Sequence, residues 1–468
     1  MSPRALVPTL EFDRGTLLLS AATLLPLAEW CPGVVWSWDD RVRSWRADAR
    51  HYRESIEALR RHLPGLLNRV PAWERLTWPA VQLPALRSEQ QQAVEAWLVE
   101  RRGVVEMPTG TGKTEVALAL MAATSVSTLV VSPVRDLMYQ WHRRILAGLG
   151  YDAGIVGDSV YRVRPVSVTT YDSACIHMEK FGNQFGLIVF DECHHLPGQV
   201  RSDAARMSCA PFRLGLSATL ERADGRHADL EAWIGPTVYS LPISAVKGAS
   251  LADYDVIRIP VHLTDDEQSR YDTLSQRVRD YVRDRLKHDP RFTWEQVCQE
   301  SNSDPRSRQA LRDFRAKQSI EDRADEKLRV LEDIFRLHVG SPTIIFTGSN
   351  AMAREVSRRF LVPCLLSHCR KRERQDILSG LADGTYPAVV ANRVLDEGVD
   401  LPAVKVAIVI GGSSSTRQLR QRLGRILRKQ GGQRATLYEV VCASTTEEGR
   451  SRRRRAADAF EGTLYRQL

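Results

Sequence analysis

Lysine is scarce in this chain, although basic residues are abundant. Of 66 basic residues in a chain of 468, nine are lysine and the rest are arginine, and the formal net charge is +9. An excess of arginine suits binding to phosphate backbones, because the guanidinium group can bind phosphate oxygens in pairs. The codon bias of a GC-rich genome explains the same excess equally well, so both interpretations stay open.

The sequence also lacks any two cysteines in a C-x-x-C arrangement. Its eight cysteines are scattered, and the closest pair is Cys364 and Cys369. This distribution argues against a zinc ribbon and against a four-cysteine iron–sulfur site. It predicts reduced thiols in a cytoplasmic protein.

Long apolar runs are absent as well. None approaches the ~20 residues that a membrane-spanning helix needs. Residues 1–4 do not begin a basic segment followed by an apolar core, so we expect no signal peptide and no membrane partner. Hydrophobic residues make up 43% of the chain and charged residues 26%, as in a soluble globular protein, and the length predicts roughly two to four domains.

The most informative stretch is residues 107–114, with the sequence MPTGTGKT. An apolar run precedes it and a helical apolar pattern follows, which predicts a strand, a glycine-rich loop and a helix. Gly110 and Gly112 let backbone N–H groups approach a phosphate, and the helix N-terminus adds partial positive charge. Lys113 is then placed to reach the β- and γ-phosphates of ATP, and the Thr114 hydroxyl is placed to hold Mg²⁺.

This loop departs from the strict phosphate-binding pattern at one position, since Met107 stands where glycine is expected. Thr109 and Thr111 belong to the part of the loop that keeps the required backbone donors. About 20 residues upstream, Arg87 and Gln90 lie at the start of another predicted helix. A glutamine amide offers the donor and the acceptor needed to read an adenine edge, so this region predicts an ATP site.

A second motif follows the apolar run at residues 187–190, which predicts a strand buried on both faces of a parallel sheet. Asp191 and Glu192 come directly after it, at the carboxyl edge where open α/β sheets bind ligands. We expect Asp191 to hold Mg²⁺, directly or through water. We expect Glu192 to orient and polarise the attacking water.

Two adjacent histidines in the same segment, His194 and His195, raise the question of a metal site. No third and fourth ligands stand at a suitable spacing, which argues against one. We expect His194 instead to connect the nucleotide site to Ser217 and Thr219, which follow the next predicted strand, at residues 213–216.

The second half of the chain resumes the α/β alternation from about residue 328, without a second phosphate loop. Within its arginine-rich segment, residues 415–428, Arg425 and Arg428 share one face of a predicted helix. Such a pair can neutralise charge on a transferring phosphoryl group. Residues 246–327 break the alternation and read as a helical insertion, whose arginines either are solvated or contact nucleic acid.

The first 78 residues read as a separate module that holds six of the ten tryptophans. Strands are expected at 17–19 and 34–38, and a helix from Tyr52 to about Leu63. Arginines interleave here with Trp45 and Tyr52. This arrangement fits a stacking and phosphate-binding surface, and it fits equally a small domain with a tryptophan-rich core.

Taken in this order, the motifs resemble those of superfamily 2 helicases, and most closely the xeroderma pigmentosum group B type. The resemblance is strong over 76–468 and weaker over 1–75. It implies an α/β fold with two RecA-like parallel-sheet domains in tandem, a small N-terminal α+β domain and a helical thumb-like insertion. The expected boundaries are 1–78 for a damage-recognition-like domain, 79–245 for helicase domain 1, 246–327 for the insertion, and 328–468 for helicase domain 2 with a basic tail.

The resemblance implies an ATP- and Mg²⁺-dependent DNA helicase or translocase of 3′→5′ polarity, in DNA repair, acting on single-stranded or forked DNA near the nucleoid. A nuclease or repair protein is an expected partner. The implied ATP-binding residues are Arg87, Gln90, Thr109, Gly110, Thr111, Gly112, Lys113, Thr114, Gly398 and Asp400. Lys113, Glu192, Gln421, Arg425 and Arg428 are implied in catalysis, and Gln140, Thr169, Thr170, Arg222 and Asp224 in DNA binding.

One departure from the family leaves the activity open. Arg222, Ala223 and Asp224 resemble an Arg-Glu-Asp loop that the family associates with strand separation, but the middle acid is missing. A non-unwinding ATP-gated clamp, or a recruiter of a nuclease, therefore remains an alternative to a helicase. An RNA helicase of the same core is a further one.

Overall fold

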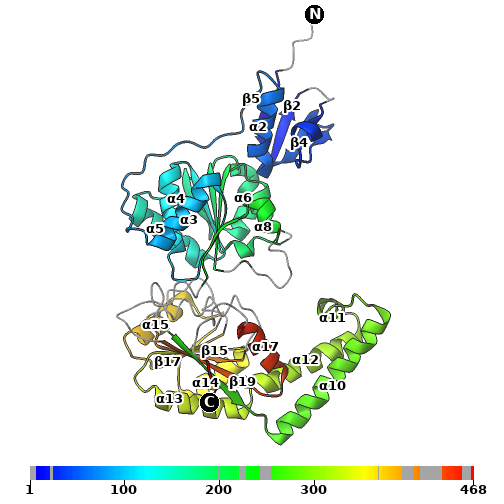
Figure 1. The fold of residues 1–468 in the computed structure, drawn as a ribbon, viewed down its shortest axis with the longest axis vertical. Helices are drawn as coiled ribbons and strands as arrows, with labels where there is room; N and C mark the ends of the chain where they lie inside the picture. Colours follow the sequence, from blue (N-terminus) through cyan, green and yellow to red (C-terminus); the bar gives the residue numbers. More distant parts are fainter. Residues whose placement is uncertain are drawn as a thin grey trace, which may run out of the picture. The chain divides into compact units, whose positions relative to one another are not determined.

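The computed structural model describes residues 7–21, 25–198, 200–218, 220, 228–242, 254–366, 368–392, 404–411, 435–455 and 465–467. The chain forms two compact units, Met1–Pro242 and Ile243–Leu468. Each contains a parallel sheet with helices around it (Figure 1), so the predicted α/β class with two such domains is confirmed. No helix in the described ranges is long and apolar enough to cross a membrane.

The first unit begins with a small five-stranded sheet of order β3-β4-β2-β1-β5. Its strands are β1 (Thr9–Asp13), β2 (Thr16–Ser20), β3 (Ser37–Asp39), β4 (Ser44–Asp48) and β5 (Leu67–Asn68), with helices α1 (Leu27–Trp30) and α2 (Tyr52–His62). The helix expected from Tyr52 is therefore present. The strand expected at 34–38 begins only at Ser37.

Tryptophans of this module lie at the border of its core rather than only on its surface. Trp30, Trp36, Trp45 and Trp73 are partly buried against the apolar cluster that includes Leu17 and Leu59. The module also contacts the rest of its unit through charged groups: Arg206 Nε lies 3.1 Å from Asp48 Oδ2, and Arg102 pairs with Glu54.

The larger sheet of the first unit has the order β13-β6-β12-β11-β7-β10-β8-β9. Its strands are β6 (Arg102–Glu106), β7 (Thr128–Ser132), β8 (Gly154–Gly157), β9 (Val160–Arg162), β10 (Val166–Thr170), β11 (Leu187–Asp191), β12 (Phe212–Ser217) and β13 (Thr237–Ser240). All neighbours pair in parallel except β8 and β9, which form an antiparallel hairpin.

Both faces of this sheet are covered, which explains why its central strands are apolar throughout. The helices are α3 (Ser88–Glu100), α4 (Lys113–Thr124), α5 (Arg135–Leu149), α6 (Tyr171–Phe181), α7 (Asp203–Arg206) and α8 (Asp229–Trp233), with α3, α4 and α5 on one face and α6 and α8 on the other (Figure 1). Successive residues of β11 point to opposite faces of the sheet and pack into two separate hydrophobic cores. Val189 belongs to one core and Phe190 to the other.

The second unit contains a parallel sheet of order β16-β17-β15-β18-β19-β14-β20. Its strands are β14 (Tyr254–Val261), β15 (Thr343–Thr347), β16 (Cys364–Leu365), β17 (Ala388–Ala391), β18 (Val406–Ile410), β19 (Ala435–Cys442) and β20 (Tyr465–Gln467). β14 corrects one expectation. It lies within the stretch 246–327 that was predicted as helical, but it pairs with β19 over its full length.

The helices in the described part of the second unit are α10 (Asp265–His288), α11 (Trp294–Glu300), α12 (Pro305–Asp322), α13 (Asp325–Leu337), α14 (Asn350–Phe360), α15 (Lys371–Ala382) and α17 (Thr446–Arg455). A capping box at Thr264 and Glu267 starts α10. Asp304 caps α12, with Pro305 as its first residue. The expected helical insertion is present as the helices α10 and α12, with α11 between them in the chain.

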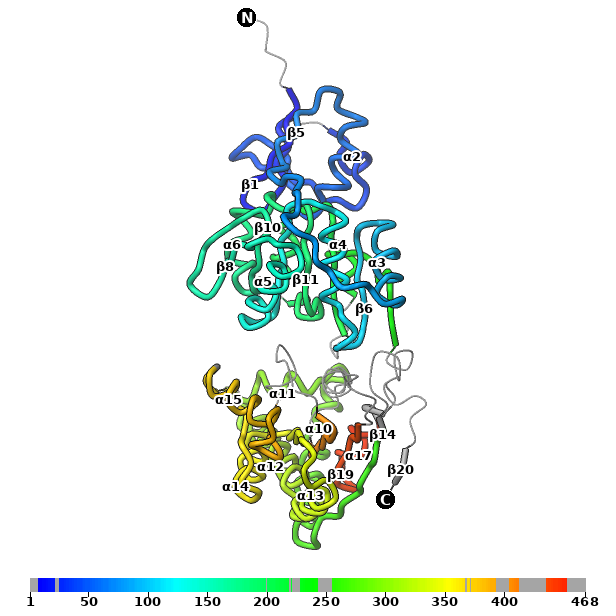
Figure 2. Tube along the Cα trace, turned by 90° about the vertical axis from the view of Figure 1, so that its left-hand side faces the viewer, coloured from blue at the N-terminus to red at the C-terminus, as the bar shows by residue number. Residues whose placement is uncertain are grey.

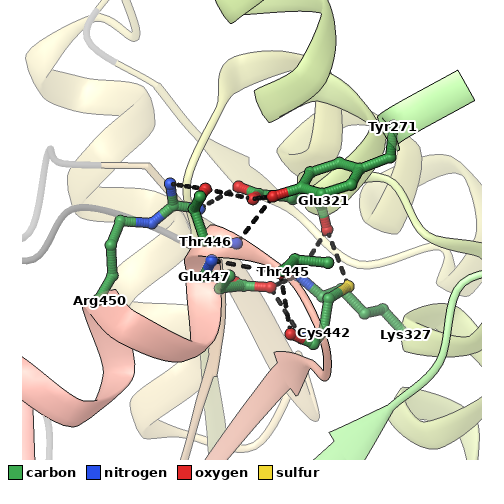
Figure 3. A network of polar contacts seen from close by, with 8 residues as sticks. All are labelled: Tyr271, Glu321, Lys327, Cys442, Thr445, Thr446, Glu447 and Arg450. Atoms are coloured by element: carbon green, nitrogen blue, oxygen red, sulfur yellow. Dashed lines mark hydrogen bonds and ion pairs between the residues drawn. The ribbon is translucent and has the colours of Figure 1, made fainter. Parts of the chain in front are cut away.

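A buried polar network joins this helical pair to α17 and β19 (Figure 3). Tyr271 Oη donates to Glu321 Oε1 at 3.0 Å, and Glu321 also pairs with Arg450. Lys327 Nζ lies 2.7 Å from Glu447 Oε2, and both side chains are fully buried. Because a buried charge that loses its partner is strongly destabilising, these pairs hold the helices to the sheet.

Candidate functional site

The phosphate loop has the conformation that its glycines predict. Gly110 and Gly112 have φ values of 90° and 85°, in the left-handed region, and α4 begins at Lys113 directly after Gly112. Thr111 Oγ1 donates to the Pro108 carbonyl at 2.6 Å, which closes the loop on itself. The loop thus ends at the N-terminus of α4, a site suited to an anion.

Lys113 lies at the centre of this arrangement. Its Nζ donates to the Met107 carbonyl at 3.1 Å and lies 3.8 Å from Glu192 Oε1. Met107, the residue that departs from the strict pattern, is itself fully buried, and its N–H donates to the Ser217 carbonyl at 2.9 Å. Strands β6, β11 and β12 therefore bring the loop, Glu192 and Ser217 to one edge of the sheet.

Asp191 is held in place at the end of β11. Trp141 Nε1 donates to its Oδ2 at 2.8 Å, the Glu192 N–H donates to its Oδ1 at 3.1 Å, and Tyr171 Oη donates to its backbone carbonyl at 3.0 Å. Burial, together with the neighbouring Glu192 carboxylate, raises the pKa of Asp191 to about 6. A cation bound nearby would favour the ionised form.

Glu192 adopts a left-handed backbone conformation, with φ 47°, that is rare for residues other than glycine. Its carboxylate lies between two partners: Oε1 near Lys113, and Oε2 at 3.4 Å from His194 Nδ1. His194 Nδ1 also lies 3.0 Å from Ser217 Oγ. The four side chains form a continuous polar chain from the phosphate loop to the end of β12, as expected for His194 and Ser217.

Arg87 and Gln90 contact the phosphate loop itself. Gln90 Nε2 and Arg87 Nη2 both donate to the Thr111 carbonyl, the former at 2.8 Å, and Gln90 Oε1 accepts from the Arg87 N–H at 2.9 Å. Much of the hydrogen-bonding capacity of the Gln90 amide is therefore taken up by contacts within the protein. A role in reading adenine remains a prediction, and support of the loop is what the contacts show.

The donor set around the loop fits a magnesium–nucleotide. Thr109 Oγ1 is buried and, within the described ranges, has no hydrogen-bond partner, which suits a phosphate oxygen at that position. The Thr114 hydroxyl and the Asp191 carboxylate are hard oxygen donors, and Mg²⁺ is usually held by one or two carboxylates plus substrate phosphates. Among the described side chains, no cluster of three or more His, Cys, Asp or Glu could hold a metal alone.

The residues expected to contact DNA differ in accessibility. Gln140 is exposed on α5. Thr170 Oγ1 accepts from the Ser173 N–H as the cap of α6, and its side chain lines a hollow of 460 Å³ that also includes Arg135. Thr169 is fully buried, and its hydroxyl donates to the Val156 carbonyl at 2.7 Å. A contact from the Thr169 side chain to DNA is therefore not available in this conformation.

Several expected site residues lie outside the described residues. They are Thr219, Arg222, Asp224, Gly398, Asp400, Gln421, Arg425 and Arg428, together with Ala223. Their roles stay predictions.

Two residues that hold Asp191 were not identified from the sequence. The Trp141 side chain on α5 is buried, with its Nε1 on Asp191. Tyr171 is 20 positions before Asp191 in the chain and is fully buried. Aromatic residues inside helical patterns are ordinary core residues, so no sequence signal distinguished these two.

A comparison with known proteins shows the family to which this chain belongs. A protein of Sulfurisphaera tokodaii, named DNA 3′-5′ translocase XPB2, is 37% identical to this chain over 449 residues, which cover 95% of this chain and 99% of that protein. The chain belongs to the XPB family of superfamily 2 helicases. The predicted resemblance is therefore confirmed.

Three family models match successive parts of this XPB-type chain. The xeroderma pigmentosum group B helicase damage recognition domain matches residues 10–63, the type III restriction enzyme res subunit matches 83–222, and the helicase conserved C-terminal domain matches 326–430. The DNA 3′-5′ helicases XPB of Kineococcus radiotolerans and Mycobacterium tuberculosis are 29% and 27% identical. The matches cover 82% and 81% of this chain but 64% and 65% of those proteins.

Solved structures support the fold. Dbp5 of S. cerevisiae, bound to RNA and ADP BeF3, superposes with a TM-score of 0.54 at 14% identity, covering 81% of this chain and 89% of that one. A variant of the same protein with one substitution, in the same bound state, gives a TM-score of 0.52 at 15% identity, with the same two coverages. At this identity the likeness concerns the architecture alone.

Proposed function

We propose that this protein is an ATP-dependent DNA helicase or translocase that moves 3′→5′ along a strand, couples that movement to the opening of DNA, and acts in DNA repair. The observation that carries the proposal is the convergence of Lys113, Asp191, Glu192 and Ser217 at one edge of the first sheet. Membership of a helicase family implies ATP-dependent activity. The name of the translocase from Sulfurisphaera supports the polarity and the substrate.

In this proposal the site residues of the first unit divide the work of ATP binding and hydrolysis among them. Lys113 binds the β- and γ-phosphates, Thr114 and Asp191 hold Mg²⁺, and Glu192 orients and polarises the attacking water. When bound, Mg²⁺ would neutralise charge on the phosphates. The short chain from Glu192 through His194 to Ser217 offers a route by which hydrolysis is sensed at the end of β12.

The second unit supplies the positive charge that neutralises the negative charge developing on the γ-phosphoryl group. Arg425 and Arg428 act on the γ-phosphate, with Gln421, Gly398 and Asp400 facing the nucleotide, in the positions that the family motifs imply. Charge neutralisation by such arginines contributes a factor of about 10³–10⁵ in turnover in well-studied phosphoryl-transfer systems. Loss of the γ-phosphate then releases that contact, and one cycle of binding and release becomes one step along the strand.

A translocase without efficient strand separation is the second candidate. Ala223 replaces the acidic residue of the Arg-Glu-Asp loop, and the family associates that loop with unwinding rather than with ATP hydrolysis. This form of the protein would move on DNA, or clamp it, and deliver a nuclease or repair partner.

The deciding experiment measures ATP hydrolysis by the full chain with single-stranded DNA, duplex DNA and RNA. Lys113→Ala serves as the control for contaminating ATPases. We expect DNA to stimulate ATP hydrolysis strongly, and we expect this stimulation to be lost in the variant. A second assay then measures whether the protein, moving 3′→5′ along a single strand, displaces streptavidin bound to that strand. Preference for RNA would reassign the substrate, and lack of stimulation by any nucleic acid would contradict an autonomous motor.

Unwinding is then tested separately on duplexes that carry a 3′ tail. Translocation without strand displacement supports the second candidate. If Ala223→Glu restores displacement while ATPase is unchanged, the missing acid is the cause.

A further inference from the structure

Two hollows adjoin at the edge of the first unit's large sheet, where β8 and β9 form their hairpin. Figure 2 shows β8 beside α6 in this region. The first, of 460 Å³, is lined by Arg135 and by Thr170, which is expected to contact DNA. The second, of 420 Å³, contains Tyr161, His177 and Lys180 and has no assigned role. They share Asp158 and Ser173 as lining residues, so the two hollows lie side by side.

The hairpin between the hollows has a tight turn that is hydrogen-bonded to α5. Its two turn residues, Asp158 and Ser159, have φ values of 52° and 63°, as a two-residue turn with both central residues left-handed requires. Asp158 Oδ1 accepts from Arg135 at 2.7 Å, and its Oδ2 accepts from Tyr139 Oη at 3.0 Å. The turn of the hairpin is thereby tied to α5.

The second hollow presents groups suited to a nucleotide. Tyr161 is 55% exposed, and its ring meets the His177 ring edge-on at 5.0 Å between centroids. His177 Nδ1 is buried and lacks a hydrogen-bond partner within the described part of the chain. Lys180, one turn further along α6, is exposed. An aromatic face beside a cation is the combination with which proteins bind single strands.

The charges around the hollows also permit a polyanion to bind there. Asp158 is neutralised by Arg135, and Asp172 by Arg201, whose Nε lies 3.1 Å from its Oδ1. Asp136 lies in the first turn of α5, on the side of the first hollow. In the second hollow the one acidic wall, Asp158, is thus already paired, while Lys180 adds a positive charge.

We propose that Tyr161, His177 and Lys180 form a nucleotide subsite for single-stranded DNA. One base stacks on the exposed Tyr161 ring, and its phosphate lies beside Lys180. This inference rests on the proposed function, because it continues the strand beyond the hollow at Thr170. It adds a contact that neither the helicase motifs nor the matched family models assign.

Equilibrium binding of an oligothymidine to the full chain without ATP tests the subsite independently of hydrolysis. Tyr161→Ala is expected to raise the Kd about 5- to 20-fold, within the range observed when a stacking aromatic is removed. Tyr161→Phe, which keeps the ring, is expected to bind as the parent protein does. Val99→Ala, at a 78% exposed position on α3, is the surface control.

A fluorescent base places the contact along the strand. With 2-aminopurine at successive positions, quenching at one position should disappear in Tyr161→Ala and persist in Tyr161→Phe. Lys180→Ala should reduce the slope of log Kd against log salt by about 1, as expected for one lost phosphate contact.

Each contrary result has a definite meaning. Equal affinity of Tyr161→Ala and the parent protein overturns the subsite and leaves the proposed translocase standing. Equal losses in the alanine and phenylalanine variants contradict stacking, since the hydroxyl would then be the contact. Competition by polyglutamate as strong as that by DNA of equal charge also contradicts it. Failure of the parent protein to bind any single strand overturns both proposals.

Discussion

Glu192 occupies a backbone conformation that non-glycine residues seldom adopt, at the edge where ATP is proposed to bind. Such conformations cost about 1–3 kcal/mol each, and they occur disproportionately at functional sites. The strained turn directs the carboxylate between Lys113 and His194. At the scale of single residues, Glu192 is therefore the most direct test of the chemistry.

Glu192→Gln should bind ATP with an affinity close to that of the parent protein but hydrolyse it about 10²–10⁴ times more slowly, because an amide cannot polarise water as a carboxylate does. Fluorescent-nucleotide binding and steady-state ATPase assays measure the two properties. Glu179→Gln, at an exposed position on α6, is the matched control. Normal turnover in Glu192→Gln would remove this residue from its role.

The geometry of the phosphate loop leaves little room for a side chain at Gly112. A Cβ built on Gly112 would lie 2.2 Å from Gln90 Nε2, and the residue has φ +85°. A side chain there would both strain the backbone and displace the amide that holds the Thr111 carbonyl. The loop thus depends on glycine for two separate reasons.

Gly112→Ala should consequently abolish ATP binding, whereas Gly65→Ala should not. Gly65 has φ +82° but no atom within 4 Å of the added Cβ, so it reports backbone strain alone, on the order of 1 kcal/mol. Nucleotide binding and thermal unfolding of both variants separate the two effects. Equal ATP affinity in the two variants would contradict the proposed fit between Gln90 and the loop.

A second element-scale feature is the acidic residue at the end of α12. Burial raises the pKa of Asp322 to about 6; Glu447 and Glu321 add to this shift, and Lys327 and Arg450 oppose it. The folded state therefore binds a proton more tightly than the unfolded state, for which the ordinary value is 3.8. By linkage, the contribution of Asp322 to stability falls as pH rises from about 4 to 6, and the loss persists above 6.

Asp322→Asn should remove this dependence. Relative to the parent protein, we expect the variant to gain stability between pH 5 and pH 8, as measured by urea unfolding of the full chain at both values. Asp333→Asn, at a 73% exposed position on α13, is the control. A parent protein whose stability rises over this interval by the same amount as that of Asp322→Asn would contradict the assignment.

At the scale of the whole molecule, the two units contribute different parts of the proposed reaction. The first unit contains the phosphate loop, Asp191 and Glu192, and the second contains the arginine-rich segment at 415–428. Hydrolysis should therefore require both, whereas nucleotide affinity should depend chiefly on the first.

Arg428→Ala in the full chain should change ATP affinity modestly while turnover falls by about 10³ or more. ATPase rates at saturating ATP, together with nucleotide binding, provide the measurement. Arg359→Ala, at an exposed position in the last turn of α14, is the control. Lost binding with unchanged turnover at saturation would be inconsistent with the proposed role.

Local sequence determined the α/β class, the strand–loop–helix at residues 107–114 and the acidic pair after β11. These features arise from apolar periodicity and from glycine spacing, which act over a few neighbouring residues. Tertiary structure alone decided which distant groups meet. Trp141 holds Asp191 across 50 positions, Lys327 meets Glu447 across 120, and β14 joins the second sheet beside β19. Such contacts depend on how strands order within a sheet, and no local pattern encodes that order.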